Sequence, residues 1–205
     1  MRLENPLDDV LASSSHVKVL RALFAVPSGL ERSGRDIARR AGISHPRANQ
    51  VLSDLVEQGL VQIKRQPRTD FYQLNERHAL VEPLGELFEL EPSLKFELLS
   101  LIARELKARK LPVTTARIFG SAVHGTMGSG SDVDLALVTS SARVARVEAG
   151  AQEIAEAVRE RFGTRLNVLV GAPSLAALTK RPGGGVWGSV DREGTDVFAG
   201  SEAHT

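Results

Sequence analysis

A glycine–serine pair, followed after ten intervening residues by two closely spaced aspartates, constrains the fold of this chain more than any other feature. Gly120 and Ser121 follow the apolar segment 113–119, and Asp132 and Asp134 begin another apolar segment. Short apolar runs bounded by turn residues predict buried strands. Because side chains two residues apart on a strand point to the same face, we expect both carboxylates side by side at one end of a sheet.

The chemistry of this run predicts a site for a metal ion and a nucleotide. Two neighbouring carboxylates repel one another unless a cation joins them, and Mg²⁺ takes carboxylates together with substrate phosphates. Gly120 lets a phosphate approach the backbone closely, and Ser121 offers a hydroxyl at the start of an expected helix, where an anion is favoured. We therefore expect Asp132 and Asp134 to bind Mg²⁺. Three further residues are expected to bind a nucleoside triphosphate: Gly120, Ser121 and Ser131.

The segment 118–135 resembles the minimal nucleotidyltransferase family of the DNA polymerase β superfamily, whose motif is Gly-Ser followed by Asp-x-Asp. The resemblance extends over residues 113–170. It implies that Asp132 and Asp134 are a catalytic, magnesium-binding pair and that a third carboxylate on a neighbouring strand completes the site. It also implies transfer of a nucleoside monophosphate to a hydroxyl or an amine. Small transferases of this type can act as antitoxins by modifying a partner toxin.

One position departs from that family pattern. Asn167 lies in the expected strand 165–170, where the third carboxylate belongs, and no acidic residue occurs between Glu160 and Asp191. An amide is neutral and cannot accept a proton from an attacking hydroxyl as a carboxylate can. In a two-metal mechanism, an amide at this position weakens binding of the second metal ion most. The domain is therefore expected to bind Mg²⁺–nucleotide with slow or absent transfer or to be catalytically silent, and an active transferase is the alternative.

The first third of the chain has a different pattern, in which three helices precede two strands. The expected helices cover 16–26, 34–41 and Ser44 to about Gln58, and the expected strands cover 60–64 and 71–74. Such an order is typical of a winged helix, whose third helix fits the major groove of duplex DNA. The basic charge agrees with that function, because residues 32–68 contain eight basic and three acidic residues in a chain of net charge +1.

Residues 13–75 resemble the winged-helix bacterial transcription regulators of the MarR and ArsR type. Arginine can pair with guanine, and asparagine or glutamine with adenine, so polar side chains on the third helix are expected to contact bases. The basic residues of the strand–turn–strand wing are expected to contact the DNA backbone or minor groove. The resemblance and the pattern together assign DNA binding to Ser44, His45, Arg47, Asn49, Gln50, Arg65 and Arg68.

We therefore expect an α+β chain made of a winged helix-turn-helix, a connecting helix and a nucleotidyltransferase-like α/β domain. The expected bounds are 1–80, 81–111 and 112–200, with a leucine-rich helix over 93–110. Helix-turn-helix proteins commonly bind two half-sites, so double-stranded DNA and a second copy of this chain are the expected partners. A further protein partner is the alternative expectation, and the Leu-rich helix is either core or a dimer contact.

Composition excludes several other classes of protein. The chain has no cysteine, which excludes disulfide frameworks and cysteine nucleophiles. No run reaches the ~18 apolar residues of a membrane helix, and the N-terminus has no apolar segment of a secretory signal. The expected protein is a cytoplasmic DNA-binding transcription regulator with a nucleotidyltransferase-like domain.

Overall fold

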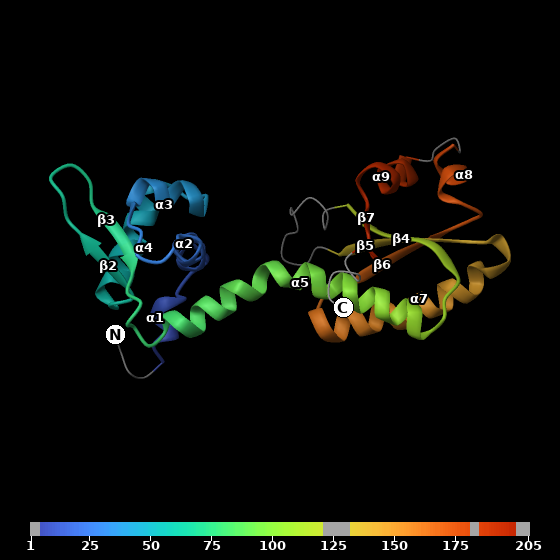
Figure 1. The fold of residues 1–205 in the computed structure, drawn as a ribbon, viewed down its shortest axis with the longest axis horizontal. Coiled ribbons are helices and arrows are strands. Elements are labelled where there is room, and N and C mark those ends of the chain that lie inside the picture. Colours follow the sequence, from blue (N-terminus) through green and yellow to red (C-terminus); the bar gives the residue numbers. More distant parts are fainter. Residues whose placement is uncertain (1–4, 121–131, 181–184, 200–205) are drawn as a thin grey trace. The chain divides into compact units, whose positions relative to one another are not determined.

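The computed structural model describes residues 5–120, 132–180 and 185–199 (Figure 1). The chain divides into two compact units, Met1–Pro92 and Ser93–Thr205. Within the described ranges, no helix is long and apolar enough to cross a membrane.

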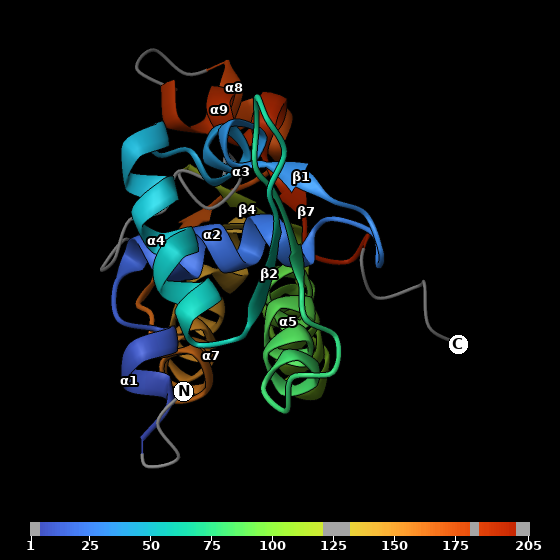
Figure 2. The ribbon, with the colours of Figure 1, turned by 90° about the vertical axis from the view of Figure 1, so that its left-hand side faces the viewer.

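The first unit is a winged helix, seen from its own side in Figure 2. Its three strands form an antiparallel sheet in the order β1-β3-β2. The sequence predicted two of these strands but not β1, whose two residues form a strand only by pairing with β3. The elements are α1 (Leu7–Val10), α2 (Ser14–Phe24), β1 (Arg32–Ser33), α3 (Gly34–Ala41), α4 (His45–Glu57), β2 (Val61–Lys64) and β3 (Phe71–Leu74).

Local signals fix the ends of these helices. The hydroxyl of Ser13 accepts a hydrogen bond from the backbone of His16 at the start of α2, and Ser33 does the same for Asp36 at the start of α3. Gly42 ends α3 in the left-handed conformation, with φ of 63°. The apolar faces of α2, α3 and α4 pack together as expected from their periodicity. They bury Val19, Leu20, Leu23, Ile37, Val51, Leu52 and Leu55.

One long helix, α5 (Val81–Ala108), begins in the first unit and ends in the second. The sequence predicted a helical connector over 81–111 and placed its strong leucine-rich helix at 93–110; the structure instead has one helix that starts at Val81 and runs through Pro92, although proline lacks a donor for the helix. The first half is held by packing, since Phe24 and Phe88 place their ring centroids 5.2 Å apart and Arg21 pairs with Glu91 at 2.5 Å. These contacts offset the hydrogen bond that Pro92 cannot donate.

The second unit is a four-stranded mixed sheet with helices on both faces (Figure 1). Its strand order is β6-β5-β4-β7, in which only the β5–β6 pair is parallel. The sequence predicted three of these strands. The elements are β4 (Val113–Phe119), β5 (Val133–Thr139), the short 3₁₀ helix η1 (Ser141–Arg143), α7 (Val144–Phe162), β6 (Leu166–Gly171), α8 (Leu175–Thr179), α9 (Gly185–Glu193) and β7 (Thr195–Asp196).

The strand β5 is buried on both faces, and its alternation decides where the aspartates lie. Leu135 and Leu137 belong to the core shared with α5 and α7, whereas Ala136 and Val138 belong to the core with α9. By the two-residue period of a strand, Asp134 lies on the α9 side, at the strand end where the apolar core stops. Asp134 is therefore the one residue of β5 that is not buried, and all the other residues of the strand lie within the fold.

Candidate functional site

The two aspartates of the sequence motif meet a single amide where the neighbouring strands β5 and β6 begin. Asp134 and Asn167 are register partners on the parallel strands β5 and β6, and Asp132 directly precedes β5. The side-chain nitrogen of Asn167 donates to Asp132 Oδ2 and to Asp134 Oδ1, each at 3.3 Å. The amide therefore lies between both carboxylates and offsets part of their mutual repulsion without adding a charge.

Gly120 directly follows β4 and lies beside the Asp134 carboxylate. Its neighbour Phe119 is the register partner of Asp134, and Gly120 has φ of +71°. A β-carbon at position 120 would lie 2.7 Å from Asp134 Oδ2. Glycine is required here both for its left-handed backbone and for the space that the Asp134 side chain occupies.

The metal-ligating side chains among the described residues suit one magnesium ion better than two. Two carboxylates supply hard oxygen ligands that Mg²⁺ can share with phosphate oxygens. The nitrogen of the Asn167 amide, and not its oxygen, faces the two carboxylates, so the oxygen can bind a metal held between them only if the amide turns over. Over residues 5–120, 132–180 and 185–199, there is no group of three or more acidic or histidine side chains that could hold a metal. The predicted nucleotide ligands Ser121 and Ser131 lie outside the described residues.

The recognition helix α4 presents its predicted polar side chains in two different ways. His45, Asn49 and Gln50 are exposed, and Ser44 takes the N-cap position without a capping hydrogen bond from its side chain. Arg47 is instead half-buried. Exposed side chains can reach base edges directly, whereas Arg47 must first break the hydrogen bonds that it makes within the winged helix.

Those contacts connect α4 to the start of α2. The Arg47 guanidinium donates from Nε to Ser15 Oγ at 3.2 Å, from Nη2 to Ser13 Oγ at 3.1 Å and from Nη1 to Gln50 Oε1 at 2.9 Å. All three acceptors are neutral, so a charged phosphate can replace them as a stronger partner, and so can a guanine through two parallel hydrogen bonds. Ser13 and Ser15 were not singled out by the sequence, because their contact with Arg47 depends on how α2 packs against α4.

A buried histidine extends the same network. His16 is 5% exposed, and its ring lies between Ser13 Oγ, at 2.9 Å from Nδ1, and Asp54 Oδ2, at 3.4 Å from Nε2. Burial lowers the pKa of His16 below 6.5, Asp54 opposes that change, and Arg47 adds to it. The neutral imidazole is therefore the form that the folded unit favours.

This pKa shift predicts that the winged helix loses stability in acid. The folded state binds fewer protons at His16 than the unfolded chain does, so stability present above pH ~6.5 falls as the pH drops through that value. Chemical denaturation of wild type and His16→Gln at several pH values measures the effect. The substitution should flatten the pH dependence between about pH 7.5 and 5.5. Equal pH slopes in the two proteins would contradict the assignment.

A polar cleft of about 390 Å³ opens between α3, α4 and the wing. It brings together three predicted DNA-binding side chains, His45, Asn49 and Arg68, while Arg65 is exposed outside it. The sequence missed Arg35, at the start of α3, although it belongs to the same basic segment. The cleft is lined by Ser33, Gly34, Arg35, His45, Asn49, Arg68, Thr69, Asp70 and Tyr72.

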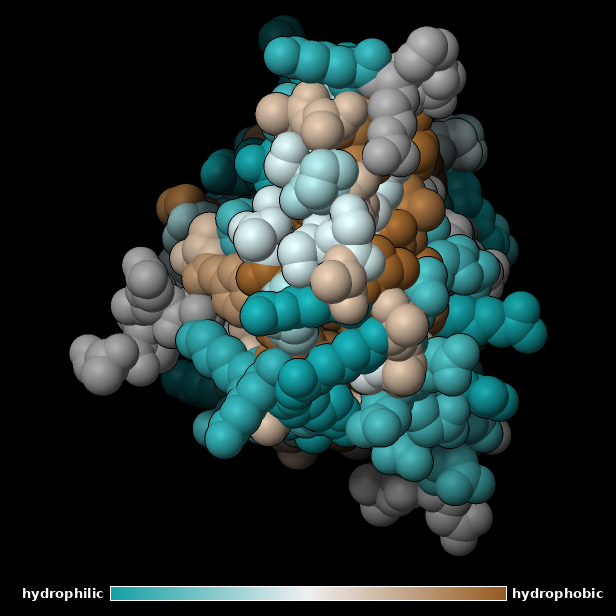
Figure 3. Space-filling view, turned by 90° about the vertical axis from the view of Figure 1, so that its right-hand side faces the viewer, coloured by the Kyte–Doolittle hydropathy of each residue, from teal (hydrophilic) through white to brown (hydrophobic). Residues whose placement is uncertain are grey.

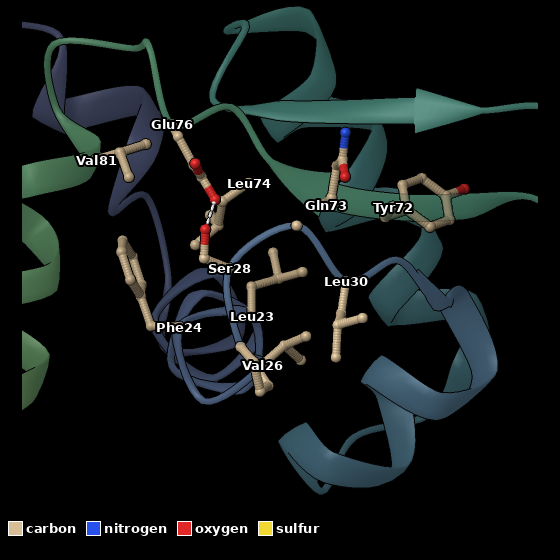
Figure 4. A pocket seen from close by; sticks show the side chains of 12 residues that line it. Leu23, Phe24, Val26, Ser28, Leu30, Tyr72, Gln73, Leu74, Glu76 and Val81 are labelled. Carbon is tan, nitrogen blue, oxygen red and sulfur yellow. Dashed lines mark hydrogen bonds between the residues drawn. The ribbon is translucent and has the colours of Figure 1, made fainter.

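An apolar pocket of about 260 Å³ lies on another side of the winged helix (Figure 4). It is formed by the end of α2, the loop that follows it, β3 and the start of α5. Figure 4 shows Phe24 and Val81 toward one side and Leu23, Val26 and Leu30 below. Ser28 donates a hydrogen bond to Glu76 across this pocket. None of the residues assigned from the sequence lines it.

Comparison with known families agrees with the two units. Residues 13–69 match the model of the MarR family, and residues 99–171 match that of the nucleotidyltransferase domain. Each match falls within one unit. The first unit therefore carries a MarR-type winged helix and the second a nucleotidyltransferase domain. No curated protein sequence matches the chain.

Three solved structures illustrate what the chain is similar to. NolR from Sinorhizobium fredii has 25% identity over 42% of this chain and 81% of its own, with a TM-score of 0.34. A homodimeric winged helix-turn-helix DNA-binding domain from Mycobacterium bovis has 25% identity over 42% and 70%, with a TM-score of 0.32. A toxin-antitoxin with AMP-PNP has 15% identity over 48% and 71%, with a TM-score of 0.33.

Proposed function

We propose that this protein, a MarR-type winged helix joined to a nucleotidyltransferase domain, is a cytoplasmic transcription regulator that binds duplex DNA and a magnesium–nucleotide with little or no transfer. The observation that carries the proposal is the Asn167 amide, which bridges Asp132 and Asp134 where a transferase needs a third carboxylate. DNA binding belongs to the first unit and nucleotide binding to the second.

The DNA-binding half of the proposal is supported by the outer face of the first unit. The exposed side chains at the start of α4 offer donors and acceptors for base edges. The exposed Arg65 and Arg68 follow β2 in the turn of the wing, where positive charge suits a phosphate backbone. Because helix-turn-helix proteins commonly bind two half-sites one helical turn apart, we propose that two copies of the chain act together.

The nucleotide half is supported by the carboxylate pair and the glycine beside it. Asp132 and Asp134 would hold one Mg²⁺, which supplies a Lewis acid for the nucleotide phosphates when bound. Gly120 leaves the Asp134 carboxylate its space. Asn167 cannot take the proton from an attacking hydroxyl, and the residues that the structure describes place no third acidic side chain beside the pair. Binding is therefore favoured over transfer.

Two measurements on the full chain test this proposal. Selection from a random pool of duplex DNA should recover a preferred sequence with two related half-sites. Incubation with a radiolabelled nucleoside triphosphate, Mg²⁺ and candidate acceptors should give no product that depends on Asp134. Labelled transfer that is lost in Asp134→Ala would show instead that the chain is an active nucleotidyltransferase. Failure to enrich any sequence from the pool would contradict the DNA-binding function.

Arg47 and Arg68 should contribute to DNA binding in different ways. If Arg47 contacts a guanine, Arg47→Ala costs about 1–3 kcal/mol of binding free energy and relaxes the base preference at one position. Arg68→Ala should weaken binding evenly across sequences and reduce the salt slope by about 1. Competition assays with single-base variants of the selected site measure both.

The control for Arg47 is Arg47→Lys, which keeps the charge but loses the planar fork that pairs with guanine. Thermal denaturation of each variant reports whether the contacts to Ser13 and Ser15 also stabilise the unit. Unchanged affinity and base preference in Arg47→Ala, with normal stability, would exclude Arg47 from base contact.

A further inference from the structure

A cluster of exposed basic side chains lies where α5 ends and α7 begins. Lys107, Lys110, Arg143 and Arg146 are all exposed, and we call these four residues the basic patch. The guanidinium of Arg146 donates to the backbone carbonyl of Lys110 at 3.3 Å, which joins the two halves of the patch. Figure 3 views the side of the second unit on which these ends of α5 and α7 lie in Figure 1, and hydrophilic side chains gather in the lower half of that view.

Packing beneath the patch holds its two segments together. Gly150 on α7 has no side chain, and a β-carbon there would lie 2.7 Å from both terminal methyl carbons of Leu111. Thr139 donates from its hydroxyl to the carbonyl of Pro112 at 2.5 Å. The segment after α5 and the segment before α7 are therefore fixed side by side, so the four cations form one surface.

The charge of the patch is not neutralised by its acidic neighbours. Glu105 and Glu153 both pair with Arg109, which is not part of the patch. Glu148 is exposed and lies two residues from Arg146 on α7, and residues at that spacing do not face each other on a helix. Within the described part of the chain, none of the four patch residues forms an ion pair with a carboxylate.

The groups around the patch add to its suitability for phosphates. The exposed hydroxyls of Ser140 and Ser141 flank it, and the 19-residue helix α7 begins there with no acidic residue in its first turn. The N-terminus of a helix carries a partial positive charge. Four cations, two hydroxyls and a helix end suit a chain of phosphates better than a single small anion.

The patch is distinct from the carboxylate site. It lies beyond Thr139 at one end of β5, whereas Asp134 lies near the other end of that seven-residue strand. A strand rises about 3.3 Å per residue, so the two surfaces are roughly 15–20 Å apart along the strand. A nucleotide bound at the carboxylates would not occupy the patch.

We propose that the basic patch binds the sugar–phosphate backbone of the duplex DNA held by the winged helix, as a second contact that carries no sequence information. This inference rests on the proposed DNA-binding function. Once the winged helix is bound, the second contact is intramolecular, so a weak electrostatic interaction is amplified by a high effective concentration. The second unit then adds affinity and lengthens the protected DNA segment.

The test compares three full-length proteins on a long duplex that carries the selected site. The patch variant is Lys107→Gln with Arg146→Gln. The matched control, Arg159→Gln with Arg192→Gln, removes the same charge from exposed positions on the same unit but outside the patch. Binding is measured by fluorescence anisotropy at several salt concentrations, and the protected segment is measured by footprinting.

Loss of two phosphate contacts should reduce the slope of log affinity against log salt by about 1.8 and weaken binding at least about tenfold at 100 mM salt. The protected segment should shorten, while the control retains the wild-type slope. A short duplex that covers only the winged-helix site should bind the patch variant and wild type equally.

Equal slopes, affinities and footprints for the patch variant and the control on the long duplex would overturn the inference while leaving the winged-helix function intact. Wild type that binds neither duplex would overturn the proposed function and the inference with it. An acidic membrane is the competing partner, and vesicles of phosphatidylglycerol test it. Patch-dependent binding to these vesicles with unchanged DNA binding would assign the patch to lipid and overturn the inference.

Discussion

Replacing Asn167 by aspartate is expected to create a tighter magnesium site. The new carboxylate would stand where an amide now donates to Asp132 and Asp134 at 3.3 Å. Two unit charges 4 Å apart interact by about 4 kcal/mol at the effective dielectric of a surface site. Screening and desolvation reduce that figure, so we expect Mg²⁺ affinity to rise about ten- to hundredfold. Calorimetric titration of Mg²⁺–ATP and Mg²⁺–GTP into both proteins measures the gain.

The same substitution should make folding of the second unit depend on metal. Without Mg²⁺, three carboxylates replace two carboxylates bridged by an amide, and their repulsion destabilises the unit. With Mg²⁺, the melting temperature of Asn167→Asp should recover, because a ligand that binds only the folded state stabilises it. Asn167→Ala is the control, since it removes the amide without adding charge. Equal responses of Asn167→Asp and Asn167→Ala to Mg²⁺ would place residue 167 outside the metal site.

Gain of labelled transfer in Asn167→Asp would carry a further meaning. It would indicate that the remaining machinery is intact and that the amide alone limits the chemistry. Binding without transfer would indicate that other parts of the site have also departed from a working transferase. Either result is compatible with nucleotide binding by wild type, so the titration and the transfer assay are interpreted separately.

The elements that could be predicted from the sequence are those with strong local signals. The helix 34–41 has the predicted bounds because Gly42 adopts the left-handed conformation that ends it. The Asp132 and Asp134 side chains share a face because strand alternation depends on the chain alone. The family resemblance placed Asn167 on a strand next to the aspartates, and in the structure that strand pairs in parallel with β5 so that Asn167 lies opposite Asp134.

Elements that depend on distant contacts were missed. The two-residue strand β1 exists through its pairing with β3. The part of α5 before Pro92 is helical because Phe88 and Glu91 contact α2. The helix α9 begins at a glycine, a poor helix former, and is held by buried Trp187 and Val190. The contacts of Arg47 likewise depend on serines more than 30 residues away.

Gly120→Ala is expected to weaken metal–nucleotide binding strongly while costing only modest stability. Gly120 has φ of +71°, and a β-carbon there would lie 2.7 Å from Asp134 Oδ2. A non-glycine residue in that backbone region costs roughly 1–2 kcal/mol. In addition the Asp134 carboxylate must move away from its present position. A displaced metal ligand should weaken Mg²⁺–nucleotide binding by on the order of a hundredfold or more, which is a larger loss than outer contacts cause.

Gly163 provides the matched control, because it has φ of +65° and nothing within 4 Å of a β-carbon. Gly163→Ala should lose similar backbone stability, measured by chemical denaturation, yet retain nucleotide binding in calorimetry. The difference between the two variants isolates the steric effect on Asp134 from the strain that both share. If both variants bind Mg²⁺–nucleotide as wild type does, Asp134 is not a ligand and the carboxylate pair serves only the fold. If both lose binding equally, strain in the unit rather than the position of Asp134 governs the site.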